Sequence, residues 1–163
     1  MGKRELIDAF QQARAYFLDT IEGLADEDFL RPGAVGIWSV KDVMAHLTAW
    51  ESELVTALVK IEHGKKGTPS IVQIDDIDEW NAEQYHASAG RPLNIISDDF
   101  QGVGKYLIEA LGQLDDAVLD DNRKFDWMEG EPLSYLVYEN AIWHEEEHGD
   151  DIRAWRESLE ENS

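Results

Sequence analysis

Apolar residues recur at spacings of three and four along most of the chain, which is the period of a helix that buries one face. The pattern predicts a first helix over residues 3–23, followed by a proline-glycine break at residues 31–33. Ser39 has the character of an N-cap, and Asp42 stands three residues later, as in a capping box. We therefore expect a second helix from Ser39 to about Gly64.

The second half of the chain predicts two further long helices. A short helix is expected over residues 75–89, and a long one over residues 94–118 with Ile95 on its apolar face. After a loop at residues 119–130, a proline in the first turn opens a last helix that runs from residue 132 to about 160. No stretch has the alternation of a strand. The prediction is an all-α four-helix bundle with a short extra helix between its second and third helices.

Composition and charge narrow the classes of function. The chain has 163 residues, of which 43% are hydrophobic, and no shift in composition marks a second domain, so we expect one domain over residues 1–163. It has no cysteine, which excludes disulfides and thiolate metal sites. The net charge of -21 predicts that nucleic acid and anionic membranes are not partners. With neither an apolar signal segment nor a membrane span, we expect a cytoplasmic protein.

Two histidines in the last predicted helix carry the strongest chemical signal. His144 and His148 are four residues apart and therefore share a helix face, with their Cβ atoms about 5–6 Å apart. His144 falls seven residues after Val137 and His148 seven residues before Trp155, so both are expected to face the bundle interior. The same period places Glu145 and Glu146 away from the interior, on a solvated acidic face.

His46 lies on the apolar side of the second helix, between Val43 and Trp50. A buried polar group without a partner costs about 1–3 kcal/mol, so three inward histidines are best satisfied together by one cation. His46, His144 and His148 are therefore the candidate metal ligands. Three neutral nitrogens leave a coordination position open, as in catalytic rather than structural metal sites.

Other interpretations of these histidines stay open at this point. A lone inward histidine is more often hydrogen-bonded in a core, and many histidine pairs at this spacing are surface features. Asp151 follows His148 by three residues and is suited to accept a proton from its ring. His63 and His86 are expected at the surface.

The segment Gly36-Ile-Trp38-Ser-Val-Lys-Asp-Val-Met-Ala-His46-Leu-Thr-Ala-Trp50-Glu51 resembles the signature of the DinB-like (YfiT-like) superfamily. The histidine pair at 144 and 148 matches the second mark of that family. The segment from Asp78 to Tyr85 is similar to the ClbS/DfsB branch. The resemblance implies an up-down-down-up bundle and a divalent ion, nickel or zinc, on the three histidines. It also implies a small-molecule substrate.

We therefore expect a metal-dependent hydrolase or transferase that acts on a small molecule. Glu51 and Glu147 are the candidate catalytic bases. The residues expected to line the substrate pocket are Trp38, Trp50, Asn81 and Tyr85. One alternative is a ClbS/DfsB-like binding or self-resistance protein, either a metal-independent hydrolase or a sequestering module. Another is a homodimeric bundle whose histidines satisfy one another through water.

Overall fold

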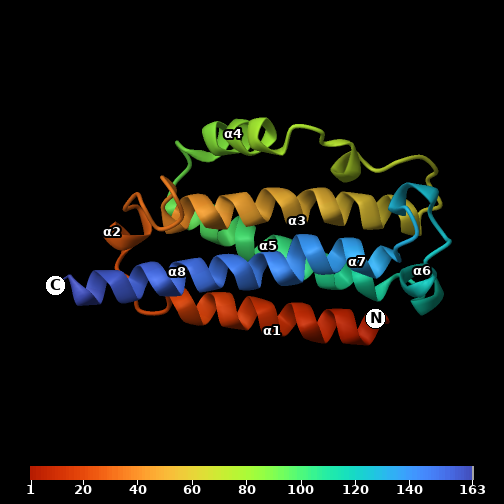
Figure 1. Ribbon diagram of the computed structural model, residues 1–163, viewed down its shortest axis with the longest axis horizontal. Helices are drawn as coiled ribbons and strands as arrows, with labels where there is room; N and C mark the ends of the chain where they lie inside the picture. Colours follow the sequence, from red (N-terminus) through yellow and green to blue (C-terminus); the bar gives the residue numbers. More distant parts are fainter. Residues whose placement is uncertain (163) are drawn as a thin grey trace.

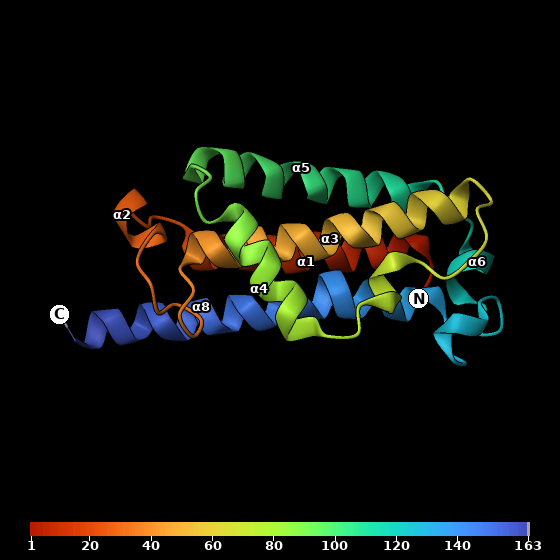
Figure 2. The same cartoon turned by 90° about the horizontal axis from the view of Figure 1, so that it is seen from above.

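The structure, a computed structural model, describes residues 1–162 and is all-helical, which confirms the predicted fold class. Four long helical segments lie side by side (Figures 1 and 2). These are α1 (Lys3–Ile21), α3 (Val40–Glu62), α5 (Leu93–Gly112) and a last segment that ends in α8 (His144–Glu161). Both views show α3 and α5 running in one direction and α1 and α8 in the other. No helix in the described part of the chain is long and apolar enough to cross a membrane.

Shorter elements connect the long ones. They are α2 (Asp26–Phe29), the 3-10 turn η1 (Ser70–Gln73), α4 (Ile77–Ser88), α6 (Asp116–Asp120) and the 3-10 turn η2 (Asp126–Met128). The predicted extra helix is α4, which buries no residue fully and crosses the outside of α3 (Figure 2).

The start of α3 has the predicted capping box. The Ser39 hydroxyl accepts a hydrogen bond from the Asp42 amide at 3.1 Å, and the Asp42 carboxylate accepts one from the Ser39 amide at 3.0 Å. Two amides that the first turn would leave unpaired are thus satisfied. This fixes where α3 begins and, with it, the face on which His46 lies.

The predicted third helix is shorter than expected. It ends at Gly112, and a separate helix, α6, starts after Asp115, whose backbone is extended. The apolar spacing continues through this turn because Leu114 is buried in the turn itself, at 3% exposure. The predicted apolar face is also wrong at the start of this helix. Ile95 was expected to be buried but is 37% exposed, and Ile96 is buried instead.

The predicted last helix runs without a break, but the number of residues per turn changes along its length. It consists of α7 (Leu133–Val137), the π-helical segment η3 (Tyr138–Trp143) and α8. Because a π turn holds more residues than an α turn, it rotates everything that follows it relative to a 3.6-residue pattern. The expectation that Glu145 faces solvent is therefore wrong. Glu145 is fully buried, and Trp143 is 48% exposed.

The hydrophobic core consists of two clusters along the bundle. One surrounds Phe10 and Leu54, and the other surrounds Phe17 and Leu47. Between these two levels the interior holds charged side chains from α1, α3 and α8. The apolar core is thus interrupted at mid-length, beside the region that carries the candidate site.

Candidate metal centre

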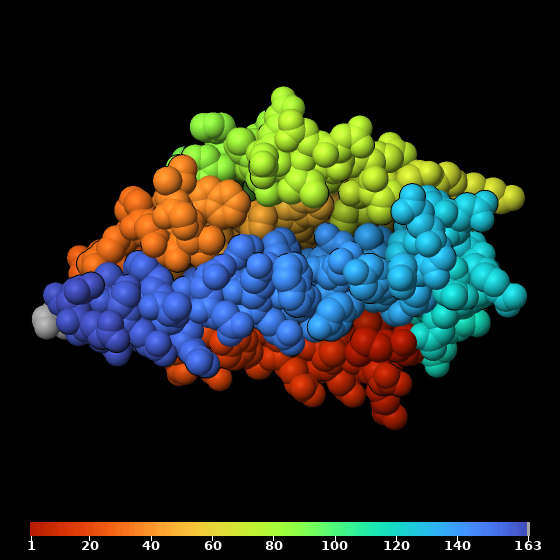
Figure 3. All heavy atoms as spheres, viewed as in Figure 1, coloured from red at the N-terminus to blue at the C-terminus, as the bar shows by residue number. Residues whose placement is uncertain are grey.

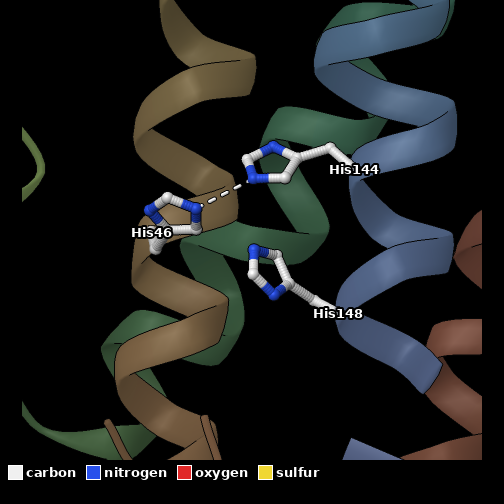
Figure 4. A group of neighbouring side chains, drawn as sticks. All are labelled: His46, His144 and His148. Carbon is white, nitrogen blue, oxygen red and sulfur yellow. Dashed lines mark hydrogen bonds between the residues drawn. The ribbon is translucent and has the colours of Figure 1, made fainter. Parts of the chain in front are cut away.

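His46 on α3 and His144 and His148 on α8 converge between the two helices (Figure 4). The Nε2 atoms of His46 and His144 are 2.9 Å apart. One ring nitrogen from each of the three residues lies within 4.8 Å of the other two. The structure therefore brings together the three predicted ligands.

Burial keeps two of these rings neutral. It lowers the pKa of His46 to about 2, with smaller contributions from His144 and His148, and lowers the pKa of His144 to about 4. A neutral imidazole has a free lone pair on one nitrogen, which is the form that binds a metal ion. At neutral pH these rings need no proton release before they coordinate a cation.

The Nδ1 atom of His148 lies 3.2 Å from a carboxylate oxygen of Asp151. This contact confirms the pairing expected from their spacing. With Nδ1 held by the carboxylate, Nε2 is the nitrogen left to face His46 and His144. Carboxylates behind metal-binding histidines fix the ring orientation and raise its basicity in this way.

The donor set fits a divalent transition metal. Nitrogen ligands at about 2.0–2.1 Å from a tetrahedral ion lie about 3.3 Å from one another. The observed range, from 2.9 Å for one pair to the 4.8 Å limit of the group, brackets this separation, so small ring rotations suffice. Imidazole ligands suit zinc, copper, iron and nickel.

The three histidines form one wall of a cavity of about 550 Å³. Figure 3 shows the corresponding hollow, with α3 recessed between α4 and α8. Trp38, Trp50 and Asn81 line this cavity, and the Trp50 indole donates a hydrogen bond to the Asn81 side-chain oxygen at 2.8 Å. Tyr85 lies behind this lining, where its ring stacks on Trp38 with centroids 6.4 Å apart.

The structure separates the two acids predicted as bases. Glu147 lies on the cavity wall beside the histidines. Glu51 is fully buried on another side of α3, and Arg14 contacts its carboxylate at 3.2 Å. Glu51 is not among the residues that line the cavity. Its contact with the positively charged Arg14 holds its carboxylate in the bundle interior instead.

Sequence reasoning missed the partners of Glu51. Arg14 also contacts the buried Glu145 carboxylate at 2.8 Å. Burial, followed by the negative charge of Glu145, raises the pKa of Glu51 well above its usual value. The spacing carried one signal, since Arg14 follows Phe10 by four residues and precedes Phe17 by three, which places it on the apolar face of α1.

The π segment also supplies cavity residues that the sequence did not indicate. Glu139, Asn140 and Trp143 line the cavity. The sequence also did not indicate the part of the cavity wall formed by the connection between α3 and α4. This part consists of Ile71, Val72 and Ile74, which lie in or directly after η1. Neither a π turn nor a 3-10 turn leaves a periodic apolar pattern long enough to be recognised.

Comparisons with known proteins agree with this architecture. A family model described as the DinB superfamily matches residues 9–152. A search of curated proteins finds no match.

Several solved structures share the fold. An uncharacterised protein from Escherichia coli UTI89 has a TM-score of 0.80 at 14% identity, covering 98% of this chain and 95% of that one. The colibactin self-resistance protein ClbS, in complex with dsDNA, has a TM-score of 0.77 at 11% identity over 94% of both chains. DfsB, a sibling lethal factor precursor, has a TM-score of 0.76 at 16% identity, covering 98% of this chain and 97% of that one.

The ClbS structure overturns one expectation from the sequence. We expected nucleic acid to be excluded as a partner because of the net charge of -21. A protein of the same fold is in complex with dsDNA, so the exclusion was wrong. Net charge describes the whole surface, whereas nucleic acid contacts one patch of it.

The matched segment spans most of the chain, from α1 to Ile152 in α8, and includes all three histidines. The fold agrees with that of ClbS and DfsB over nearly their whole lengths. This chain belongs to the DinB superfamily.

Proposed function

We propose that this protein is a metal-dependent hydrolase or transferase that acts on a small molecule. The observation that carries the proposal is the convergence of three imidazoles, two of them kept neutral by burial, on the wall of a cavity of about 550 Å³. His46, His144 and His148 would hold a divalent ion, Ni²⁺ or Zn²⁺. Such an ion supplies Lewis acidity to an oxygen or sulfur atom at its open position.

The chain's own residues have distinct roles in this proposal. Asp151 orients the His148 ring through the contact at 3.2 Å. Glu147 lies on the same cavity wall and serves as the base that accepts a proton from the attacking group. Trp38 and Trp50 provide apolar surface for the substrate, and Asn81 lies beside them with an amide group.

The test begins with protein purified without a nickel column. We expect elemental analysis to find about one equivalent of zinc or nickel per chain, and we expect chelation to remove hydrolysis or thiol transfer in a panel of small-molecule substrates. His46→Ala should lose both the metal and the activity. His86→Ala, which removes an exposed histidine of α4, is the matched control and should retain both. Full metal binding by His46→Ala would refute the site assignment.

A second candidate is supported by the likeness to ClbS and DfsB. In it, the aromatic cavity binds or hydrolyses a small electrophile without a metal. Activity or ligand binding that survives chelation and His46→Ala would favour this function over the first. Because ClbS is in complex with dsDNA, the same assays should include a labelled duplex at low and high salt.

We also propose that residues 1–163 form one domain that works in the cytoplasm as a homodimer. Analytical ultracentrifugation of the metal-loaded and chelated protein tests the dimer. If the histidines had only a structural role, chelation would lower the melting temperature without affecting any turnover.

A further inference from the structure

Arg14 and Glu145 form a charged pair in the bundle interior. The Arg14 Nε atom donates to the two Glu145 carboxylate oxygens at 2.9 and 3.0 Å, and Nη2 lies 2.8 Å from one of them. The Glu145 side chain is fully buried, and that of Arg14 is 12% exposed. Contacts from two guanidinium nitrogens to one carboxylate fix both direction and distance.

Arg14 itself is held from three further sides. Its Nη1 atom donates to the Phe100 carbonyl oxygen at 2.9 Å, and the guanidinium carbon lies 3.7 Å from the centroid of the Phe100 ring. Its Nη2 atom reaches Glu51 at 3.2 Å. Gly104 leaves the space, since a Cβ atom there would lie 2.6 Å from Nη1. The position to which Glu145 binds is therefore set by α1, α3 and α5 together.

Glu145 is also the residue next to a candidate metal ligand. It follows His144 directly, precedes His148 by three residues, and comes two residues after the end of the π segment at Trp143. If the π segment were a regular α-helix instead, α8 would be rotated by about 100° for each extra residue that the π segment accommodates. Such a rotation would carry Glu145 away from Arg14 and the two imidazoles away from His46.

Apolar packing alone specifies this rotation weakly, because Ile152 is the one large apolar side chain among the buried residues of α8. The buried charged pair specifies it strongly, since moving Glu145 away would leave the Arg14 guanidinium in the interior without this carboxylate. The Arg14–Glu145 pair therefore favours the π-helical register over the alternatives. The same register aims His144 and His148 at α3.

We propose that Arg14 and Glu145 are positioning residues that lock the rotation of α8 and so assemble the three-histidine site. Neither residue lines the cavity. The proposal deepens the metal-site function proposed above and rests on it for one of its two readouts.

The first readout is the affinity for Co²⁺, followed through its visible spectrum with the full-length protein. We expect Glu145→Ala to weaken Co²⁺ binding by about 10–100-fold, the range found when groups that orient metal ligands are removed. The second readout is hydrogen exchange in the metal-free protein, where Glu145→Ala should speed exchange in residues 138–148.

Arg156→Met is the matched control. Arg156 also links α8 to α1, through the carbonyl oxygens of Thr20 and Glu22 at 3.1 and 2.6 Å, but it lies two turns beyond His148. We expect it to lower the melting temperature while leaving the Co²⁺ affinity within twofold and exchange in residues 138–148 unchanged.

A folded Glu145→Ala variant that binds Co²⁺ within twofold of the parent would overturn the proposal. If Glu145→Ala does not fold, Glu145→Gln replaces it under the same criterion, because it keeps the size and loses the charge. If the parent protein binds no Co²⁺, Ni²⁺ or Zn²⁺, the proposed function fails, and hydrogen exchange alone decides the positioning role.

Discussion

Two polar clusters lie next to each other in the bundle and share the same two helices. α3 contributes His46 to one and Glu51 to the other, and α8 contributes His144 to one and Glu145 to the other. The histidine cluster opens onto the cavity and consists of bases only. The acidic cluster is closed in the interior and contains its own cation, Arg14, between the two carboxylates.

The difference separates a closed polar cluster from an open one. Arg14 donates three hydrogen bonds to its acids, two to Glu145 and one to Glu51. Among the described residues, a single Glu51 oxygen is the buried side-chain atom without a partner. The histidines have no internal cation, and one contact at 2.9 Å leaves further ring nitrogens facing the cavity. The open cluster is suited to receive an ion, and the closed one already contains a cation.

Removing the internal cation should have the largest effect. Arg14→Met leaves two carboxylates in the interior, and breaking a buried pair in this way costs about 3–5 kcal/mol of unfolding free energy. Urea denaturation measures the loss. Arg153→Met is the control, because Arg153 is 64% exposed and its ion pair with Glu157 is long, at 3.7 Å. A loss below about 1 kcal/mol for Arg14→Met would mean that the closed cluster does not depend on its cation.

Acid should destabilise the open cluster. The pKa values of His46 and His144 in the folded protein, about 2 and about 4, lie below the usual 6.5. Protons therefore bind the unfolded chain first, so the stability is present above pH 6.5 and is lost as the pH falls towards the folded values. Between pH 7 and pH 5 we expect the metal-free protein to lose about 2–4 kcal/mol.

Urea denaturation of metal-free protein at several pH values checks this. The doubly substituted His46→Asn, His144→Asn variant should lose most of the slope, whereas His63→Asn should keep it because His63 is 63% exposed. An unchanged slope in the double variant would assign the pH dependence to other groups.

The space left for Arg14 provides a smaller test. A Cβ atom in Gly104→Ala would lie 2.6 Å from the Arg14 guanidinium, which is held in place by its contacts with Phe100 and Glu145. We expect a loss of about 1–3 kcal/mol in thermal or urea unfolding. Gly102→Ala meets nothing within 4 Å and should instead gain up to about 1 kcal/mol from helix propensity. Equal effects of the two changes would contradict the packing around Arg14.

The smallest effect concerns the cavity wall opposite α8. Trp50→Phe removes the hydrogen bond at 2.8 Å to Asn81 on α4, and we expect a loss of about 0.5–1.5 kcal/mol. Hydrogen exchange should also quicken in α4, which has no fully buried residue of its own. Unchanged exchange there would mean that other contacts hold α4 against the bundle.

The elements built on regular spacing were predictable from the sequence. The second helix began where its Ser39 cap indicated, and the three histidines converge as their stripes implied. The third helix was predicted too long because Leu114 continues the apolar spacing through a turn that ends the helix. Periodicity records which residues are buried, and it does not distinguish a buried turn from a buried helix face.

Glu145 shows the other limit of periodicity. A strict 3.6-residue pattern places it in solvent, and a π turn that leaves no mark in the sequence brings it inside. The closed cluster could not be predicted without this register. The pairing of His144 with His148 could, because residues four apart share a helix face whichever register the preceding segment has.

The most direct test of the central claim is a crystal structure of the protein soaked with Zn²⁺, with data collected on both sides of the zinc absorption edge. We predict one anomalous peak between His46, His144 and His148, with a nitrogen of each ring about 2.0–2.1 Å from it. A fully occupied peak elsewhere, or no peak at this position at saturating zinc, would contradict the assignment of these histidines as a metal site.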